Sequence, residues 1–162
     1  MAATAIAAEL VKTLTERKLI IATAESCTGG LVAGAITDID GSSVVFERGI
    51  ISYANSAKTA LLDVRPETLE KHGAVSEEVA AQMAEGACIR AGADIAVAVT
   101  GIAGPTGGTK TKPVGLVYIA VNMGDKTEGE KFQFSGSRHE IRAQAVAASL
   151  KLALSFLGNI PK

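Results

Sequence analysis

The sequence predicts an α/β fold: a single-domain, three-layer α/β/α sandwich around a mixed, mostly parallel sheet with one antiparallel hairpin. The first indication is that β-branched apolar runs alternate along the chain with segments whose apolar residues recur at helical spacing. The second is composition, because the 162 residues are 48% hydrophobic but only 4% aromatic, so small aliphatic side chains must build the core. We find no internal repeat or linker and expect residues 1–162 to form one domain.

The first third of the chain predicts two helix–strand pairs. Residues 4–17 carry an amphipathic pattern, and the apolar run from Leu19 predicts a buried strand that ends in small polar residues and two glycines. The next helical pattern begins at Leu31 and ends near Asp40, and residues 44–53 then predict a second strand.

The middle of the chain predicts three helices. The first is short, holds Lys58 and is capped by Asn55 or Ser56. The second begins at Pro66, which suits a first helical turn, and the third begins at Ser76, which acidic residues follow.

The last third predicts the centre and one edge of the sheet. Residues 94–100 form the clearest strand and are apolar enough to be central, and the glycine-rich segment 101–108 that follows cannot be helical. Residues 114–122 predict a strand that turns back into an antiparallel edge strand at 130–134, and a helix at about 138–157 completes the fold.

Charge and hydropathy argue against two classes of partner. The net charge is −1, and no stripe of lysine and arginine interleaves with aromatic residues, so we expect no nucleic-acid partner. No apolar run approaches the ~20 residues that span a bilayer. Residues 1–14 contain Glu9 and Lys12, unlike the apolar centre of a signal peptide, so we expect a cytoplasmic protein without a membrane partner.

Cysteine and histidine usage predicts neither a disulfide nor a metal site. Cys27 and Cys88 are the two cysteines, which are more often free than paired in a chain of this kind. No Cys-x-x-Cys or His-x-x-x-His spacing is present, so we expect no metal.

Three segments that follow strands carry candidate chemistry, because strand ends on one edge of an α/β sheet converge. They are the turn around Ser26, the segment Tyr53–Lys58 and the loop 100–108. Backbone N–H groups at a helix start attract anions, so the Ser26 hydroxyl and these donors could face one ligand atom. The alternative is that Ser26 or Thr28 only caps the helix.

Lys58 is the candidate base. A lysine in the first turn of a helix faces an unfavourable macrodipole, and partial burial would lower its pKa further. A neutral lysine can deprotonate a serine hydroxyl, as in Ser–Lys hydrolases. The alternative is a solvated lysine on a short helix. Tyr53 could orient the lysine or protonate a leaving group, or it could serve only in packing.

Several standard motifs are absent. Residues 24–28 lack both glycines of the G-x-S-x-G elbow. Residues 104–111 miss a Walker A loop by one residue, Thr109, and Pro113 and a strand follow where a helix should. We therefore expect no nucleoside-triphosphatase. The loop remains either an anion cradle or a flexible connection.

Two arginines near the start of the last helix are candidates for binding an anion. Arg138 and Arg142 follow Ser135-Gly136-Ser137 and could clamp a phosphate or carboxylate. Arginines on an exposed helix face also occur without any such role.

Taken together and in order, six stretches closely resemble the nicotinamide-nucleotide amidase family, which comprises the CinA C-terminal domain and stand-alone nicotinamide mononucleotide deamidases. The stretches are Ala24–Gly30, Gly41–Ser43 with Phe46, Tyr53–Lys58, Gly73–Ser76, Thr100–Pro105 with Gly107-Gly108, and Lys112–Gly115.

The resemblance implies a metal-free and cofactor-free amidohydrolase that converts nicotinamide mononucleotide (NMN) into nicotinate mononucleotide and ammonia in pyridine-nucleotide recycling. By position, Ser26 would be the nucleophile, Lys58 its base and Tyr53 a further catalytic residue, with N–H groups at the helix start holding the oxyanion. The expected substrate-binding residues are Cys27, Thr28, Gly29, Ser43, Thr100, Gly101, Gly104, Arg138 and Arg142. The alternative function is a non-catalytic nucleotide-binding module of the competence-associated kind. Alanine-rich helix faces favour a homo-oligomer, with a dimer the simplest case.

Overall fold

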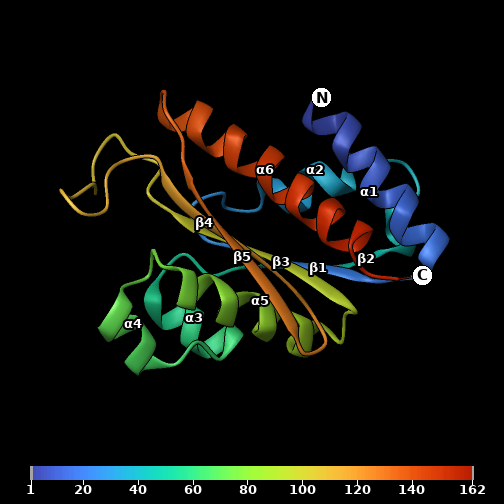
Figure 1. The fold of residues 1–162 in the computed structure, drawn as a ribbon, viewed down its shortest axis with the longest axis horizontal. Helices are drawn as coiled ribbons and strands as arrows, with labels where there is room; N and C mark the ends of the chain where they lie inside the picture. Colours follow the sequence, from blue (N-terminus) through green and yellow to red (C-terminus); the bar gives the residue numbers. More distant parts are fainter. Residues whose placement is uncertain (1, 162) are drawn as a thin grey trace.

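A mixed β-sheet forms the centre of the computed structural model, which describes residues 2–161 (Figure 1). Its strand order is β2-β1-β3-β4-β5. The strands are β1 (Ile21–Glu25), β2 (Phe46–Ile51), β3 (Ile95–Gly101), β4 (Leu116–Met123) and β5 (Lys126–Gln133). β1 pairs in parallel with both β2 and β3, whereas β4 is antiparallel to β3 and to β5. All strands except β4 therefore run in one direction within the described residues.

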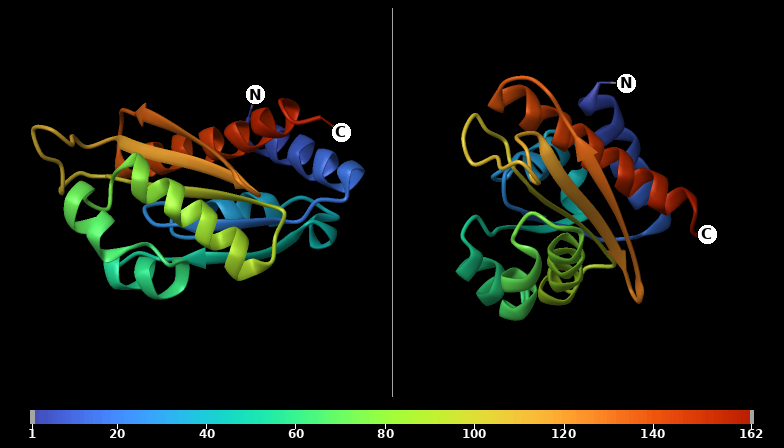
Figure 2. Two further views of the ribbon diagram at one scale, coloured as in Figure 1. Left: turned by 60° about the horizontal axis from the view of Figure 1, so that its bottom comes forward. Right: turned by 60° about the vertical axis from the view of Figure 1, so that its left-hand side comes forward.

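Helices cover both faces of the sheet and confirm the three-layer prediction (Figure 2). One face carries α1 (Ala3–Arg17), α2 (Leu31–Thr37) and α6 (Arg138–Gly158). The other carries α3 (Asn55–Leu62), α4 (Pro66–His72) and α5 (Glu77–Ala91).

The two faces of the sheet differ in side-chain size. On β3, Ile95, Val97 and Val99 point toward α1 and α6, whereas Ala96 and Ala98 point toward α5. The alanine face lets α5 approach closely, and a side chain at Gly86 of α5 would overlap the backbone oxygen of Leu62 at the end of α3. The small residues that the composition predicted are therefore concentrated on the α3–α5 side.

The structure differs from the predictions at several element boundaries and at one helix cap. Residues 42–44 form a 3-10 turn, so β2 begins at Phe46 rather than at residue 44. Helix α3 has Ala54 at its N-cap, whose methyl side chain cannot accept a hydrogen bond, and the Lys58 N–H makes the first helical bond to the Ala54 carbonyl. The expected cap by Asn55 or Ser56 was wrong. β5 pairs with β4 from Lys126 onward, since the tight turn at residues 124–125 lets pairing begin at once.

Helix α6 is long and apolar enough to cross a membrane by length and composition alone. Its 18-residue window has a mean hydropathy of 1.2, and 44% of that window is buried within the protein. Ile141, Ala145, Val146 and Leu150 belong to the core beneath it, as the sequence predicted. The apolar character of α6 is therefore accounted for by packing on the sheet and on α1.

Candidate active site

The carboxyl ends of β1, β2 and β3 converge on Ser26, as the order of segments predicted. The Ser26 N–H donates to the Val99 carbonyl of β3 at 3.0 Å. On the other side, the Ser52 N–H donates to the Glu25 carbonyl at 2.9 Å. The residue after β1 is thus held between its two parallel neighbours, and Ser26 is 8% exposed.

Lys58 reaches this strand edge from α3. Its Nζ lies 3.1 Å from Ser26 Oγ, 2.9 Å from the Ser52 carbonyl oxygen and 3.2 Å from the Tyr53 carbonyl oxygen. The residue is only 1% exposed, and this burial lowers the pKa of its ammonium below the ordinary value, against a small opposing effect of Cys27. The structure therefore favours the buried-base interpretation of Lys58 over the solvated-lysine alternative.

The start of α2 is not available to a ligand in the way the sequence predicted. The carboxylate of Glu25, itself 1% exposed, accepts the N–H groups of Gly30, Val32 and Ala33 at 3.1, 3.0 and 2.8 Å. The N-cap residue is Gly30, which makes no side-chain cap, so neither Ser26 nor Thr28 caps this helix. The expectation of free donors at the helix start is corrected, because a carboxylate from the preceding strand occupies them.

Among the residues that the structure describes, two backbone N–H groups beside Ser26, those of Cys27 and Thr28, remain without an oxygen acceptor, whereas their neighbours are bonded. The Gly29 N–H bonds to the Ser26 carbonyl at 3.1 Å, and the Leu31 N–H bonds to the Thr28 carbonyl at 3.2 Å. Within residues 2–161, no oxygen accepts the N–H of Cys27 or of Thr28. These two N–H groups replace the helix start as the candidate oxyanion donors.

The two candidate arginines have different surroundings. Arg142 donates from Nε to the Cys27 carbonyl and from Nη2 to the Thr28 carbonyl, each at 3.0 Å. Arg138 donates to the Gly104 carbonyl at 2.8 Å and to the Tyr53 hydroxyl at 3.0 Å. Arg138 is exposed, whereas Arg142 is half-buried against the turn after β1.

Tyr53 contacts Lys58 through its main chain rather than its phenol. The phenolic oxygen accepts from Arg138, and the residue is 60% exposed. The phenol is therefore exposed to solvent and lies beside Arg138, one of the two candidate anion-binding arginines.

The remaining predicted residues divide into two groups. Thr100 and Gly101 end β3 beside Ser26, with the Thr100 hydroxyl donating to the Ala74 carbonyl at 2.8 Å. Ser43 does not join them, because its 3-10 turn precedes Phe46, which pairs with the first residue of β1 at the opposite edge of the sheet. Ser43 and Ser26 of the same chain therefore lie at opposite ends of the strands, and the expected substrate-binding role of Ser43 beside Ser26 was wrong.

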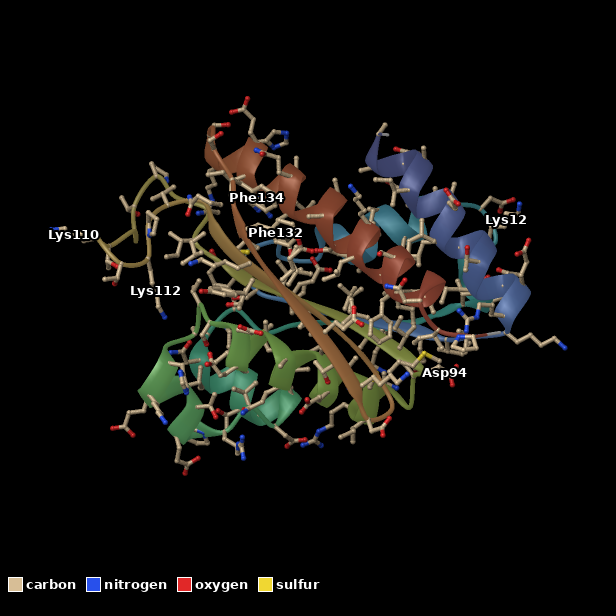
Figure 3. All side chains as sticks on the ribbon, viewed as in Figure 1. Lys12, Asp94, Lys110, Lys112, Phe132 and Phe134 are labelled. Carbon is tan, nitrogen blue, oxygen red and sulfur yellow. The ribbon has the colours of Figure 1, made fainter. Side chains whose placement is uncertain are left out.

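The glycine-rich segment forms an extended loop between β3 and β4. Its tip lies away from the rest of the chain, with Lys110 at the outer end (Figure 3). Lys112 turns back toward α4 and donates to the His72 carbonyl. At the base of the loop, the Gly104 carbonyl accepts a hydrogen bond from the candidate site residue Arg138.

Comparison with known proteins gives the family. The model of the CinA C-terminal domain matches residues 3–157. This chain belongs to the CinA C-terminal domain family. Putative competence-damage inducible proteins of Caldicellulosiruptor bescii and Acetivibrio thermocellus are 50% and 55% identical over 86% and 81% of this chain. The matches cover 34% and 32% of those proteins, so the chain spans about a third of the length of these curated relatives.

Solved structures agree with this assignment. The competence/damage inducible protein CihA from Agrobacterium tumefaciens is 45% identical with a TM-score of 0.93, and the match covers 97% of this chain and 96% of that one. The competence damage-inducible protein A from Klebsiella pneumoniae is 36% identical with a TM-score of 0.96, covering 99% and 100%. The fold of this CinA domain is therefore shared over essentially its whole length.

The two thiols of the CinA domain are free, as expected, and burial raises the pKa of each to about 11. Cys27, next to Ser26, is therefore protonated at neutral pH and a poor competing nucleophile. Cys88 lines an open hollow of about 490 Å³ at the opposite edge of the sheet and donates to the Asn122 carbonyl at 3.4 Å. Among residues 2–161, no group of three or more His, Cys, Asp or Glu side chains is placed to hold a metal ion.

Sequence reasoning missed Glu25, although a signal was present. An acidic residue at the last position of a buried strand, just before a glycine turn and a helix, is unusual enough to suggest a cap. In this CinA domain that residue organises the turn which carries the candidate nucleophile.

Proposed function

We propose that this CinA domain is an amidohydrolase that deamidates nicotinamide mononucleotide to nicotinate mononucleotide and ammonia through a Ser26–Lys58 pair. The observation that carries the proposal is the buried amine of Lys58, 3.1 Å from the Ser26 hydroxyl at the converging strand ends. The resemblance of the whole set of motifs to nicotinamide-nucleotide amidases supports the choice of substrate.

The surroundings of Lys58 suit a neutral amine. A neutral amine has two N–H bonds and one lone pair, and two carbonyls, those of Ser52 and Tyr53, lie within hydrogen-bond distance of Nζ. The lone pair is then free to accept the proton of Ser26, which lies at the third position. Burial keeps the amine unprotonated more readily than water would, so Lys58 can act as a general base.

The proposed reaction has two steps. In the first, Lys58 takes the proton of Ser26, and Oγ bonds to the carboxamide carbon. Lys58 returns the proton to the amide nitrogen, the C–N bond breaks, and ammonia leaves an acyl-enzyme. In the second step, Lys58 takes a proton from water, the hydroxide attacks the ester carbon, and Ser26 leaves with that proton restored.

Charge that develops on the carboxamide oxygen needs donors near Ser26. The N–H groups of Cys27 and Thr28 have no other oxygen acceptor among residues 2–161, so we assign the oxyanion to them. Losing one such donor typically lowers turnover by about 10²–10³-fold.

The phosphate of the nucleotide would bind at Arg138. This side chain is exposed, and its present acceptors are the Tyr53 hydroxyl and the Gly104 carbonyl, both uncharged groups that an anion can displace. Gly104 and Tyr53 would then border the phosphate site, with Thr100 and Gly101 beneath the nicotinamide.

Ammonia release from NMN by the purified protein tests the proposal. The wild-type chain should release ammonia and form nicotinate mononucleotide in equal amounts. Ser26→Ala and Lys58→Met should each lower turnover by at least about 10³-fold while the circular dichroism spectrum stays native. Ser155→Ala, an exposed serine on α6, is the matched control and should keep full activity. Full activity in Ser26→Ala would contradict the nucleophile assignment.

The second candidate function is nucleotide binding without catalysis. It is favoured by the small exposure of Ser26, which leaves little open surface at the hydroxyl. In that case calorimetry would detect NMN binding by the wild-type protein, but no ammonia would appear, and Lys58→Met would bind as tightly as the wild type.

We also propose that the protein is a cytoplasmic homodimer. Within residues 2–161, β2 pairs only with β1, and apolar side chains are exposed at the end of β2 (Ile51), just after it (Tyr53) and at the start of α2 (Leu31), which supports self-association at this edge. Light scattering coupled to size-exclusion chromatography should give twice the mass of one chain. Ile51→Lys should shift that mass toward the monomer.

A further inference from the structure

We infer that Glu25 and Arg142 are positioning residues that together hold the turn after β1 so that the N–H groups of Cys27 and Thr28 face the reacting oxygen. The inference rests on the proposed acyl-transfer function of Ser26. It departs from the sequence expectation, in which Arg142 binds the substrate.

The two side chains hold different ends of the turn. On the side of α2, the Glu25 carboxylate accepts three backbone N–H groups. On the side of α6, the Arg142 guanidinium donates to two backbone carbonyls. Each side chain makes two or three hydrogen bonds to the main chain of the turn at 2.8–3.1 Å, and bonds that involve a carboxylate or a guanidinium are stronger than those between neutral groups. A turn of small residues is thereby fixed from both sides by groups that come from β1 and α6.

Because peptide groups are planar, these contacts also fix the directions in which the Cys27 and Thr28 N–H groups point. In a trans peptide the C=O and the following N–H point in opposite directions. The Ser26 carbonyl is fixed by the Gly29 N–H, and this sets the direction of the Cys27 N–H. The Cys27 carbonyl is fixed by Arg142 Nε, and this sets the Thr28 N–H, which points away from α6.

Arg142 also changes the strength of one donor. A guanidinium bonded to the Cys27 carbonyl draws electron density from that peptide group. The Thr28 N–H belongs to the same peptide and becomes a better donor to a developing oxyanion.

The environment of Arg142 does not suit a phosphate ligand. Its Nε and Nη2 are already engaged with carbonyls of a buried turn, and the ideal Cβ position of Gly29 lies 3.4 Å from Nη2. Gly29 has a positive φ of 58°, so a side chain here would strain the turn as well as crowd the guanidinium. Arg138, in contrast, is exposed.

The test separates positioning from substrate binding by comparing two arginines and two substrates. Turnover and KM are measured for Arg142→Gln, Arg138→Gln and Glu25→Gln with NMN and with nicotinamide riboside, which lacks the phosphate. Labelling of Ser26 by a small fluorophosphonate is measured in parallel, because its phosphoryl oxygen uses the same donors but requires no nucleotide.

Positioning predicts that Arg142→Gln and Glu25→Gln lower kcat by about 10²-fold for both substrates, with KM within about threefold and labelling slowed by a similar factor. Arg138→Gln should instead raise KM for NMN alone. Added guanidinium at millimolar concentration should partly restore kcat in Arg142→Ala, which a fold defect would not allow.

The matched controls are side chains that make the same kinds of main-chain hydrogen bond far from Ser26. Arg17 donates to two main-chain carbonyls, those of Leu157 and Pro161, and the Asp94 carboxylate accepts the Ile20 N–H. Arg17→Gln and Asp94→Asn should keep wild-type kcat and labelling rates. Should Arg142→Gln not fold, Arg142→Lys, which keeps the charge on a single donor nitrogen, should show a smaller loss of kcat in the same direction.

Several results would overturn the inference. One is an Arg142→Gln enzyme with raised KM for NMN, unchanged kcat and normal labelling, since that marks a phosphate ligand. If the wild type labels but does not deamidate NMN, the proposed substrate fails, and the labelling rates of the variants still decide the inference. A wild type that neither labels nor turns over NMN would overturn both.

Discussion

Lys58 Nζ and Ser26 Oγ lie 3.1 Å apart although 32 residues separate them in the chain. The hydroxyl follows β1 and the amine follows β2, and the last residues of these strands, Glu25 and Ile51, are paired in register. The two groups therefore meet because neighbouring parallel strands end at the same level and a short helix then turns back over the edge.

The pH dependence of activity should report the buried amine. Burial lowers the pKa of Lys58, and the base must be neutral, so kcat/KM should rise with pH and level off below the ~10.4 of an ordinary lysine. Ammonia release between pH 5 and 10 measures the midpoint. A rate that still climbs without levelling at pH 10 would show that the amine has an ordinary pKa.

Stability should depend on pH through the same residue. The pKa of Lys58 is lower in the folded than in the unfolded chain, so between these two values the unfolded chain binds more protons and the free energy of unfolding rises with pH. Lys58→Met lacks this contribution. The stability of the wild type relative to Lys58→Met should therefore increase as pH rises from the lowered pKa toward ~10.4.

Urea unfolding at several pH values tests this expectation. The control is Lys12→Met, the same substitution at an exposed lysine of α1 (Figure 3). A difference between wild type and Lys58→Met that stays constant from pH 6 to 10 would contradict a lowered pKa.

Two glycines in helices should respond oppositely to alanine. Gly86→Ala places a methyl group on the backbone oxygen of Leu62 and should lower the free energy of unfolding by at least about 2 kcal/mol. Gly34→Ala in α2 meets no atom within 4 Å and should raise it by about 0.5–1 kcal/mol. Denaturant unfolding of both variants measures the difference. Equal effects would mean that α5 can move away from α3 at little cost.

Tyr53→Phe should leave the base unaffected. The contact with Lys58 uses the Tyr53 carbonyl, and the phenol contacts Arg138, so the midpoint of the pH–rate profile should not move. KM for NMN should change instead, because the phenol borders the proposed phosphate site. A shifted midpoint with unchanged KM would restore the direct catalytic role that the sequence suggested for the phenol.

The fold could be predicted because its signals are local or periodic. Helix-start chemistry at Ser76 and at Pro66, and the apolar run of β3, each indicate one structure without reference to the rest of the chain. The segment before β2 could not be placed so well. Its valines favour a strand, but Gly41 adopts a positive φ of 81° and a 3-10 turn follows, so Val44 never reaches the sheet.

The site could be predicted only as far as topology determines it. Ser26 follows β1, Lys58 lies in the helix after β2, and Thr100 is near the end of β3; these strands are adjacent in the sheet, and the rule for strand ends brings the three residues together. Which arginine holds the turn depends on long side chains from α6, and spacing alone does not distinguish Arg138 from Arg142. Glu25 was hidden for a similar reason, because its partners lie on the next helix and not on its own strand.

The alanine-lined face of the sheet has a consequence for catalysis. Lys58 lies on α3, whose last residue packs against Gly86 of α5. Helix α5 in turn packs on alanine methyl groups of the sheet. Those groups belong to Ala22, Ala24, Ala96, Ala98 and Ala120. The position of α3 therefore depends on how closely α5 lies on the sheet, and we expect one extra carbon in this contact, remote from any bound molecule, to move the Lys58 amine away from the hydroxyl that it deprotonates.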